Sequence, residues 1–319
     1  MTQSVRFVPV GAFGAVMGVA GLALASRQAH ERLGIPGWIG ETWAVIAVLL
    51  LVGLVVTYGR KAIGHRDAIK AELDNPGQLA FFGSIPIALA LTGGCLVPYA
   101  LLLARGLWWI AVITMVGLQV FSLSRWLKGG VEPAQVNTGW MIMMIGPMPM
   151  AFGGIAVGEL ESARFLFGIG LVATPFFMGM AFQRTVIGPS LPDGVRPLSF
   201  VLLVPPALIG ALIPALWSMP GHYLLDALYY FDLVLCAGLL VASRRVGRWP
   251  FTPAWWAMTF PLDALAGAGL TFAKLNPGQP AVALGWLTWG LATLVVAMVL
   301  LRSIAAFARG VLFVAPKAT

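Results

Sequence analysis

Long apolar runs separated by short polar connections extend along the whole chain. Each run is about 20 residues long, the length that an α-helix needs to cross the hydrocarbon core of a bilayer. A transmembrane barrel would instead show short segments of alternating hydrophobicity. The pattern predicts ten membrane-spanning helices, at about 7–26, 39–58, 79–102, 106–126, 139–158, 163–183, 197–217, 223–243, 253–273 and 281–307.

Glycine and proline divide these runs into two kinds. The odd-numbered runs are broken by glycine, proline or both, whereas the even-numbered runs are smoother, except for the sixth with Pro175. Irregular helices are tolerated in a bilayer where protein or a water-filled cavity satisfies the freed backbone groups. We therefore expect an all-α membrane protein of five helical hairpins, in which five kinked inner helices surround a central pore. The alternative is that the glycines are packing stripes between helices, but this does not explain why the prolines follow the same alternation.

The residues expected to line this pore lie on the kinked runs and are small or neutral, with one acidic exception. Such a lining suits an anion, because helix-end dipoles can supply partial positive charge, whereas a cation path favours rings of Asp or Glu. The expected lining residues are Gly14, Gly18, Pro86, Gly93, Gly146, Pro149, Gly153, Pro206, Gly210, Pro261, Asp263 and Gly267.

Composition and charge agree with a membrane protein. Hydrophobic residues make up 59% of the 319 residues and charged residues only 10%, against about 25% charged in soluble domains. We expect one transmembrane domain over residues 1–319 in the inner or plasma membrane. The net charge of +8 comes from residues that flank apolar runs, which favours membrane orientation and anion attraction over nucleic-acid binding. Most of the 20 Lys and Arg residues fall on the side of the two termini, which predicts that both termini are cytoplasmic.

The sequence lacks the motifs of catalysis and of metal binding. There is no Walker A motif, HExxH, CxxC or serine elbow; Cys95 and Cys236 lie inside apolar runs, and the three histidines lack ligand spacing. We therefore expect no enzyme activity, no catalytic residue, no metal and no cofactor. Transport or conduction of small inorganic or organic anions is the expected function.

Phe260 and Asp263 carry the most specific prediction. They are three residues apart in the ninth run, on one face of a helix that Pro261 interrupts. We interpret Phe260 as a ring that blocks the pore, although an aromatic residue in a membrane helix more often serves packing. For Asp263 three interpretations stay open: a protonated neutral carboxyl, an ion pair with an arginine such as Arg184, or a packing residue. The second buried acid, Asp232, is read as a structural hydrogen-bond partner.

Tryptophans at the ends of the runs suggest membrane anchors. Paired or nearby indoles at run ends are typical of the aromatic belt at a membrane surface. We assign this role to Trp38, Trp43, Trp108, Trp109, Trp255 and Trp256.

Two stretches carry a resemblance to a known family. PAWWAMTFPLDALAGAGLTF, in the ninth run, resembles the ninth helix of the TehA-like tellurite-resistance/dicarboxylate transporter family, whose relatives include the plant slow anion channels. FVPVGAFGAVMGVAGLALA is similar to the first helix of that family, and SIPIAL, WLKGG and TPFFMGMAFQR are further similar pieces.

The resemblance implies ten helices in five hairpins, a quasi-fivefold pore within each subunit, and a homotrimer. It places the family's pore-blocking phenylalanine on Phe260 and the small first-helix residue that faces the ring on Gly14. Asp263 departs from the family pattern, in which small or hydroxyl residues are usual. The expected function is an anion channel gated by Phe260. The alternative is a proton-coupled carrier of C4-dicarboxylate, sulfite or tellurite-type anions that uses Asp263.

Overall fold

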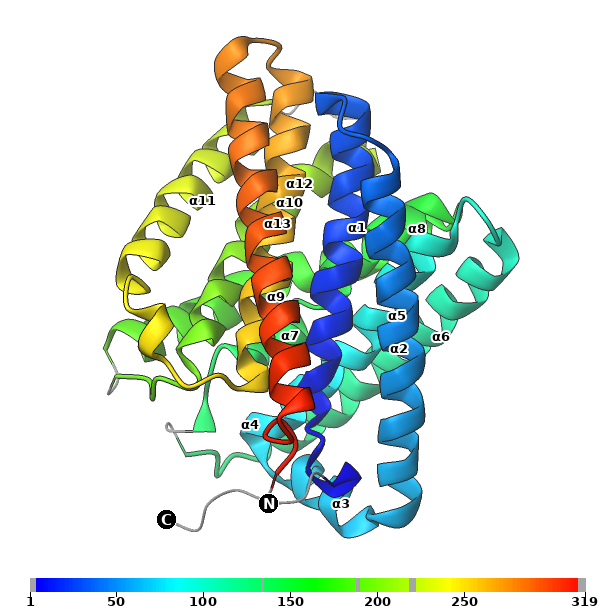
Figure 1. Cartoon of the computed structure of the whole chain (residues 1–319), viewed down its shortest axis with the longest axis vertical. Coiled ribbons are helices and arrows are strands. Elements are labelled where there is room, and N and C mark those ends of the chain that lie inside the picture. The colour runs from blue at the N-terminus through cyan, green and yellow to red at the C-terminus, as the bar shows by residue number, and fades with distance from the viewer. Residues whose placement is uncertain (1–3, 133–134, 188–189, 218–221, 315–319) are drawn as a thin grey trace.

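The computed structural model describes residues 4–132, 135–187, 190–217 and 222–314, and contains helices but no strand in these ranges (Figure 1). Nine helices are long and apolar enough to cross a membrane in this part of the chain. The remaining predicted span, 253–273, corresponds to a short 3₁₀ segment, η7 (Pro253–Met258), that continues into α12 (Thr259–Leu275). The prediction of an all-helical membrane protein is therefore confirmed.

The odd-numbered crossings are built from two or more helical pieces, and the even-numbered ones are single long helices. The composite crossings are η2 (Val10–Phe13) with α1 (Gly14–Leu33); α4 (Pro76–Leu79), η3 (Ala80–Gly83) and α5 (Ser84–Leu96); α7 (Gly139–Met144) and α8 (Pro147–Ala156); η5 (Arg196–Leu203) and α10 (Val204–Trp217); and η7 with α12. The single helices are α2 (Trp38–Gly64), α6 (Leu101–Trp126), α9 (Leu160–Val186), α11 (His222–Ala242) and α13 (Gln279–Ala308). Shorter pieces are η1 (Val5–Phe7), α3 (Arg66–Asp74) and η6 (Val246–Arg248).

Burial separates the two kinds of crossing. In the most apolar stretches of the first four composite crossings, 72–78% of residues are buried, against 17–28% in those of the single helices. The composite crossings are thus inside the bundle, where small residues allow close packing, and the single helices present Leu, Val and Phe side chains to lipid.

The inner helices form a closed ring. α1 packs against α5 and α12, α5 against α8, α8 against α10, and α10 against α12. Each inner helix also packs against the single helix that follows it, as Figure 1 shows for α1 with α2 and for α12 with α13. Five hairpins with an inner and an outer helix are therefore present.

All five inner crossings run in the same direction. The backbone N–H of Ser4 donates to the carbonyl of Phe313 at 3.1 Å, so both ends of the described chain lie on one side, here called the terminal face. One outer crossing separates successive inner crossings, so each inner crossing starts at the terminal face and ends at the opposite face.

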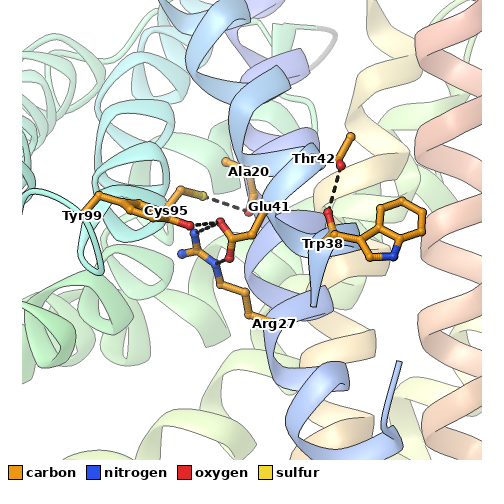
Figure 2. A network of polar contacts seen from close by, with 7 residues as sticks. All are labelled: Ala20, Arg27, Trp38, Glu41, Thr42, Cys95 and Tyr99. Carbon is orange, nitrogen blue, oxygen red and sulfur yellow. Dashed lines mark hydrogen bonds and ion pairs between the residues drawn. The ribbon is translucent and has the colours of Figure 1, made fainter. Parts of the chain in front are cut away.

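A polar cluster fastens the helices at the opposite face (Figure 2). Arg27 of α1 donates two hydrogen bonds of 2.8 Å to the carboxylate of Glu41 in α2, and the Tyr99 hydroxyl donates to the same carboxylate at 2.6 Å. The Arg27 guanidinium also lies 5.9 Å from the centre of the Tyr99 ring. Bidentate, charge-assisted bonds of this kind fix geometry as well as adding stability, so they hold α1, α2 and the turn before α6 together.

Candidate functional site

The inner crossings change helical form at similar positions along their length. α1, α5, α10 and α12 each continue from a 3₁₀ segment, and α8 follows a break after α7. Pro261 accordingly lies in the first turn of α12, where a backbone N–H has no partner within the α-helix. The first α-helical residues Gly14, Ser84 and Val204, and Phe260 at the second position of α12, line one cavity. The positive ends of these helix dipoles therefore lie at its wall.

This larger cavity has a volume of about 1080 Å³ and lies towards the terminal face. Its wall combines the first halves of the inner crossings with α3, α4 and the connections around residues 135–138 and 191–198. The polar and charged side chains around it are mostly basic or amide groups. They are Arg6, Lys61, Glu72, Asn75, Gln78, Ser84, Gln135, Asn137, Thr138, Arg184, Thr185 and Thr252.

The buried charges at this cavity are paired. Lys61 is 2% exposed, and its Nζ donates at 2.8 Å both to the Glu72 carboxylate and to the carbonyl of Val8. The Tyr58 hydroxyl donates to the second Glu72 oxygen at 2.6 Å. A buried ion is tolerated only when its charge and its hydrogen-bonding capacity are satisfied, and this network satisfies both. It joins α2, α3 and the segment that precedes η2.

A smaller cavity of about 340 Å³ lies between the second halves of the inner helices. Only three of its lining residues have polar side chains: Gln28, Asp263 and Thr271. The remaining lining residues are glycine, proline or apolar, and none is basic. The Gln28 amide donates to the Thr271 hydroxyl at 3.0 Å, and that hydroxyl donates to the carbonyl of Gly267 at 2.9 Å.

Phe260 and Pro149 line both cavities. Phe260 is buried, and its Cδ2 lies 3.1 Å from the position that a Cβ on Gly21 would occupy. The resemblance implied that Gly14 faces this ring; Gly14 and Phe260 line the larger cavity together, and a Cβ on Gly14 would lie 3.5 Å from Cβ of Trp256. Gly21, two helical turns further along the same stripe of α1, lies against the ring.

Asp263 is 3% exposed, and neither of its carboxyl oxygens has a hydrogen-bond partner in the described part of the chain. The ion pair with Arg184 is therefore not formed, and Arg184 lines the other cavity. Oδ2 lies 2.7 Å from the position of a Cβ on Gly21, so Asp263 and Phe260 share one face as expected. Asp232 on α11 is fully buried and also lacks a partner among the described residues, which contradicts the structural hydrogen bond expected for it.

The structure brings eight of the thirteen named pore residues, counting Phe260, to the cavities. Gly14, Gly146 and Pro261 line only the larger one; Gly153, Asp263 and Gly267 line only the smaller one; and Pro149 and Phe260 line both. The other five, Gly18, Pro86, Gly93, Pro206 and Gly210, line neither. Three of these glycines permit close packing: Gly18 lies against Thr259, Gly93 against α6 and Gly210 against Leu225 of α11.

Among the wall residues that sequence reasoning did not name as site residues are Gly21, Gln28, Lys61 and Glu72. Gly21 belonged to the recognised glycine stripe, but its register against α12 was not visible. Gln28 lay beyond the expected end of the first span, whereas α1 continues to Leu33. Three assigned membrane anchors are also wrong: Trp108, Trp255 and Trp256 are buried and donate to Met150, Pro250 and Ser303, respectively.

A ring of interrupted helices around two successive cavities is typical of membrane channels and transporters. The chain belongs to the SLAC1 family, described as voltage-dependent anion channels, whose family model matches residues 8–306. The resemblance identified from the first and ninth runs is thereby confirmed.

Among curated proteins, the chain is similar to S-type anion channel SLAH2 of Arabidopsis thaliana, with 27% identity over 92% of this chain and 58% of that protein. It is 25% identical to guard cell S-type anion channel SLAC1 of the same plant, over 86% of this chain and 51% of that protein. It is 22% identical to sulfite efflux pump SSU1 of Arthroderma benhamiae, over 65% of this chain and 66% of that protein. The chain thus spans only a little over half the length of these plant channels.

Proposed function

We propose that the chain is a membrane channel for small anions, in which the path runs through the two cavities and the Phe260 ring blocks it at rest. The observation that carries the proposal is that Phe260 borders both cavities inside the closed ring of inner helices. The helix N-termini at the larger cavity, and the small number of acidic residues that line the two cavities, favour anions over cations. In this proposal the protein is not an enzyme and requires no cofactor.

The proposed orientation follows the charge distribution. The terminal face is cytoplasmic, because most basic residues in the connections lie on that side. The larger cavity is then the cytoplasmic entrance, because it lies towards the terminal face. We retain the inner or plasma membrane as the location and the homotrimer as the assembly, the latter only by family resemblance.

The proposal is tested by Phe260→Ala, recorded in oocytes or planar bilayers with chloride and with nitrate. Removing the ring should raise the conductance at least about tenfold, which corresponds to lowering the barrier by about 1.4 kcal/mol. Phe152→Ala is the matched control, because Phe152 lines only the smaller cavity and should not obstruct the connection. An unchanged conductance in Phe260→Ala would remove the blocking role.

A second candidate function is a proton-coupled carrier of C4-dicarboxylate, sulfite or tellurite-type anions. It is favoured by the unpaired carboxyl of Asp263 at the smaller cavity, because ionisable groups within membrane helices commonly mark ion or proton pathways. A carrier predicts pH-driven uptake into proteoliposomes that Asp263→Asn uncouples. Linear, ohmic currents that Asp263→Asn leaves unchanged would favour the channel.

A further inference from the structure

The residues that line the smaller cavity do not compensate the negative charge that an ionised Asp263 would carry. Among the described residues that line it, Asp263 is the one acidic side chain, and none is Lys, Arg or His. An ionised carboxylate in such an apolar enclosure lacks the hydration and the partners that normally stabilise it. An anion in the same space would add a second negative charge, and like charges repel strongly where the dielectric constant is low.

The charged and titratable groups on the elements packed against α12 do not supply the missing positive charge. On α1, Arg27 is bonded to Glu41, and His30, Glu31 and Arg32 are exposed, as is Lys274 at the end of α12 itself. On α11, Tyr229 lies beside Gly269 and Asp232 is itself acidic. On α13, Arg302 lies over the Trp255 ring, and η5 contributes Arg196, which is paired with Asp193. The sequences of α10 and η7 contain no titratable side chain.

A single proton removes the repulsion. A protonated carboxyl is neutral and donates one O–H, so it can bind an anion directly. With a bound monoanion such as nitrate, the cavity then holds one negative charge, whereas an ionised carboxylate would bring the total to two. The same count applies to a protonated oxyanion such as hydrogen sulfite, because it is a monoanion as well.

The surroundings of Asp263 have the form of a small binding site. Gly21 leaves open the space beside Oδ2, since a Cβ there would lie 2.7 Å from that oxygen. At the other end of the cavity, the Gln28 amide has two N–H groups, and the described hydrogen bonds use one of them, to Thr271. An unpartnered buried carboxyl and a partly used amide therefore line the same 340 Å³ space.

We infer that the smaller cavity binds one small anion together with one proton, which Asp263 shares with the anion, and that Gln28 supplies a second donor. This inference rests on the proposed function in one respect, namely that anions enter this cavity. It requires that Asp263 carries a proton whenever an anion occupies the cavity. Binding of nitrate, halide and other monoanions should therefore weaken at alkaline pH.

The test is equilibrium binding to the purified full-length protein in detergent, which does not require passage beyond Phe260. Nitrate is the main probe, because it does not hold a proton itself and the proton must then reside on the protein. Above the pH at which Asp263 is ionised in the empty cavity, wild-type protein in weakly buffered solution should take up about one proton per nitrate, and its Kd should rise about tenfold per pH unit; below that pH the Kd should be constant. Hydrogen sulfite, which is also a monoanion, should show the same linkage.

Two asparagine variants show whether the pH dependence of nitrate binding comes from Asp263 or from any buried acid. Asp263→Asn should bind nitrate with no proton uptake and with a Kd independent of pH. Asp232→Asn is the matched control, because Asp232 is equally buried and unpaired but lines neither cavity, and it should behave as the wild type. Gln28→Leu should weaken nitrate binding without changing the number of protons taken up.

The inference is overturned if wild-type and Asp263→Asn protein show the same pH dependence, or if Asp232→Asn abolishes it. It is also overturned if nitrate and hydrogen sulfite bind neither protein. In that case a large conductance of Phe260→Ala would still support the channel, so failure of this site is distinguishable from failure of the proposed function.

Discussion

The two cavities on either side of Phe260 treat charge in opposite ways. At the larger one, the buried cation Lys61 is matched by Glu72, by a carbonyl and by the ring of Tyr58 5.2 Å away. At the smaller one, the single carboxyl of Asp263 has no partner among the described residues. Permanent charges are thus neutralised in pairs where the wall is polar, and one ionisable group is left unpaired where the wall is apolar. In the inference drawn above, binding of an anion then depends on the protonation of that group.

The contrast between the two cavities requires that the Phe260 ring separates them. The largest expected effect comes from removing this ring and then filling its space again with another side chain. In the Phe260→Ala background, Gly21→Leu places a new side chain opposite the vacated ring, since the two residues are in contact. We expect the current to fall at least about tenfold from that of the single variant, equivalent to about 1.4 kcal/mol in the barrier.

The matched control is Phe260→Ala with Gly53→Leu. Gly53 lies on the outer helix α2 with open space around it, so the added side chain points into lipid and the current should stay high. If the two double variants conduct equally, the Gly21 side of the junction does not form the constriction.

The division into inner and outer crossings was predictable from the sequence. Close packing inside a ring of helices requires small residues, so glycine and proline indicated which crossings are the inner ones. The register between helices is a tertiary property, and Gly14 and Gly21 are one heptad apart on the same stripe. Sequence pattern alone therefore could not decide which of them faces Phe260.

Lys61 shows a second limit of sequence reasoning. Its position among basic residues at the end of a span indicated a solvated, orienting charge, which is the usual role of such residues. Its ion-pair partner, Glu72, lies 11 residues later, on the short helix α3 that packs against α2. Pattern along the chain does not reveal that return, and so the charged wall of the larger cavity was not predicted.

The paired charges of the larger cavity make a second prediction, on stability. Lys61→Met leaves the Glu72 carboxylate buried without its cation, which should cost about 3–5 kcal/mol. The double variant Lys61→Met, Glu72→Gln should recover much of this loss, because no unpaired charge then remains. Unfolding in detergent, followed by circular dichroism, measures both. The comparison fails if Lys61→Met destabilises no more than Lys70→Met, which removes an exposed lysine of α3.

The smallest expected effect concerns an exposed ion pair on the same short helix. Asp67 of α3 pairs with Arg6. Slight desolvation works in the other direction, but the hydrogen bond and charge of Arg6 hold the pKa of Asp67 below its usual value. A carboxyl with a lowered folded-state pKa contributes stability above its unfolded pKa, near 3.9, and loses it as the pH falls through the folded pKa.

Arg6→Gln should therefore loosen α3 slightly at neutral pH, and the difference from wild type should vanish under strongly acidic conditions. Hydrogen exchange of the α3 amides measures this directly, with Lys61→Met as the reference for a buried pair. The expected effect is small because both side chains are largely exposed and solvent screens their attraction. If hydrogen exchange of the α3 amides rises as much in Arg6→Gln as in Lys61→Met, the exposed ion pair holds α3 as strongly as the buried pair does, and the contrast between them is wrong.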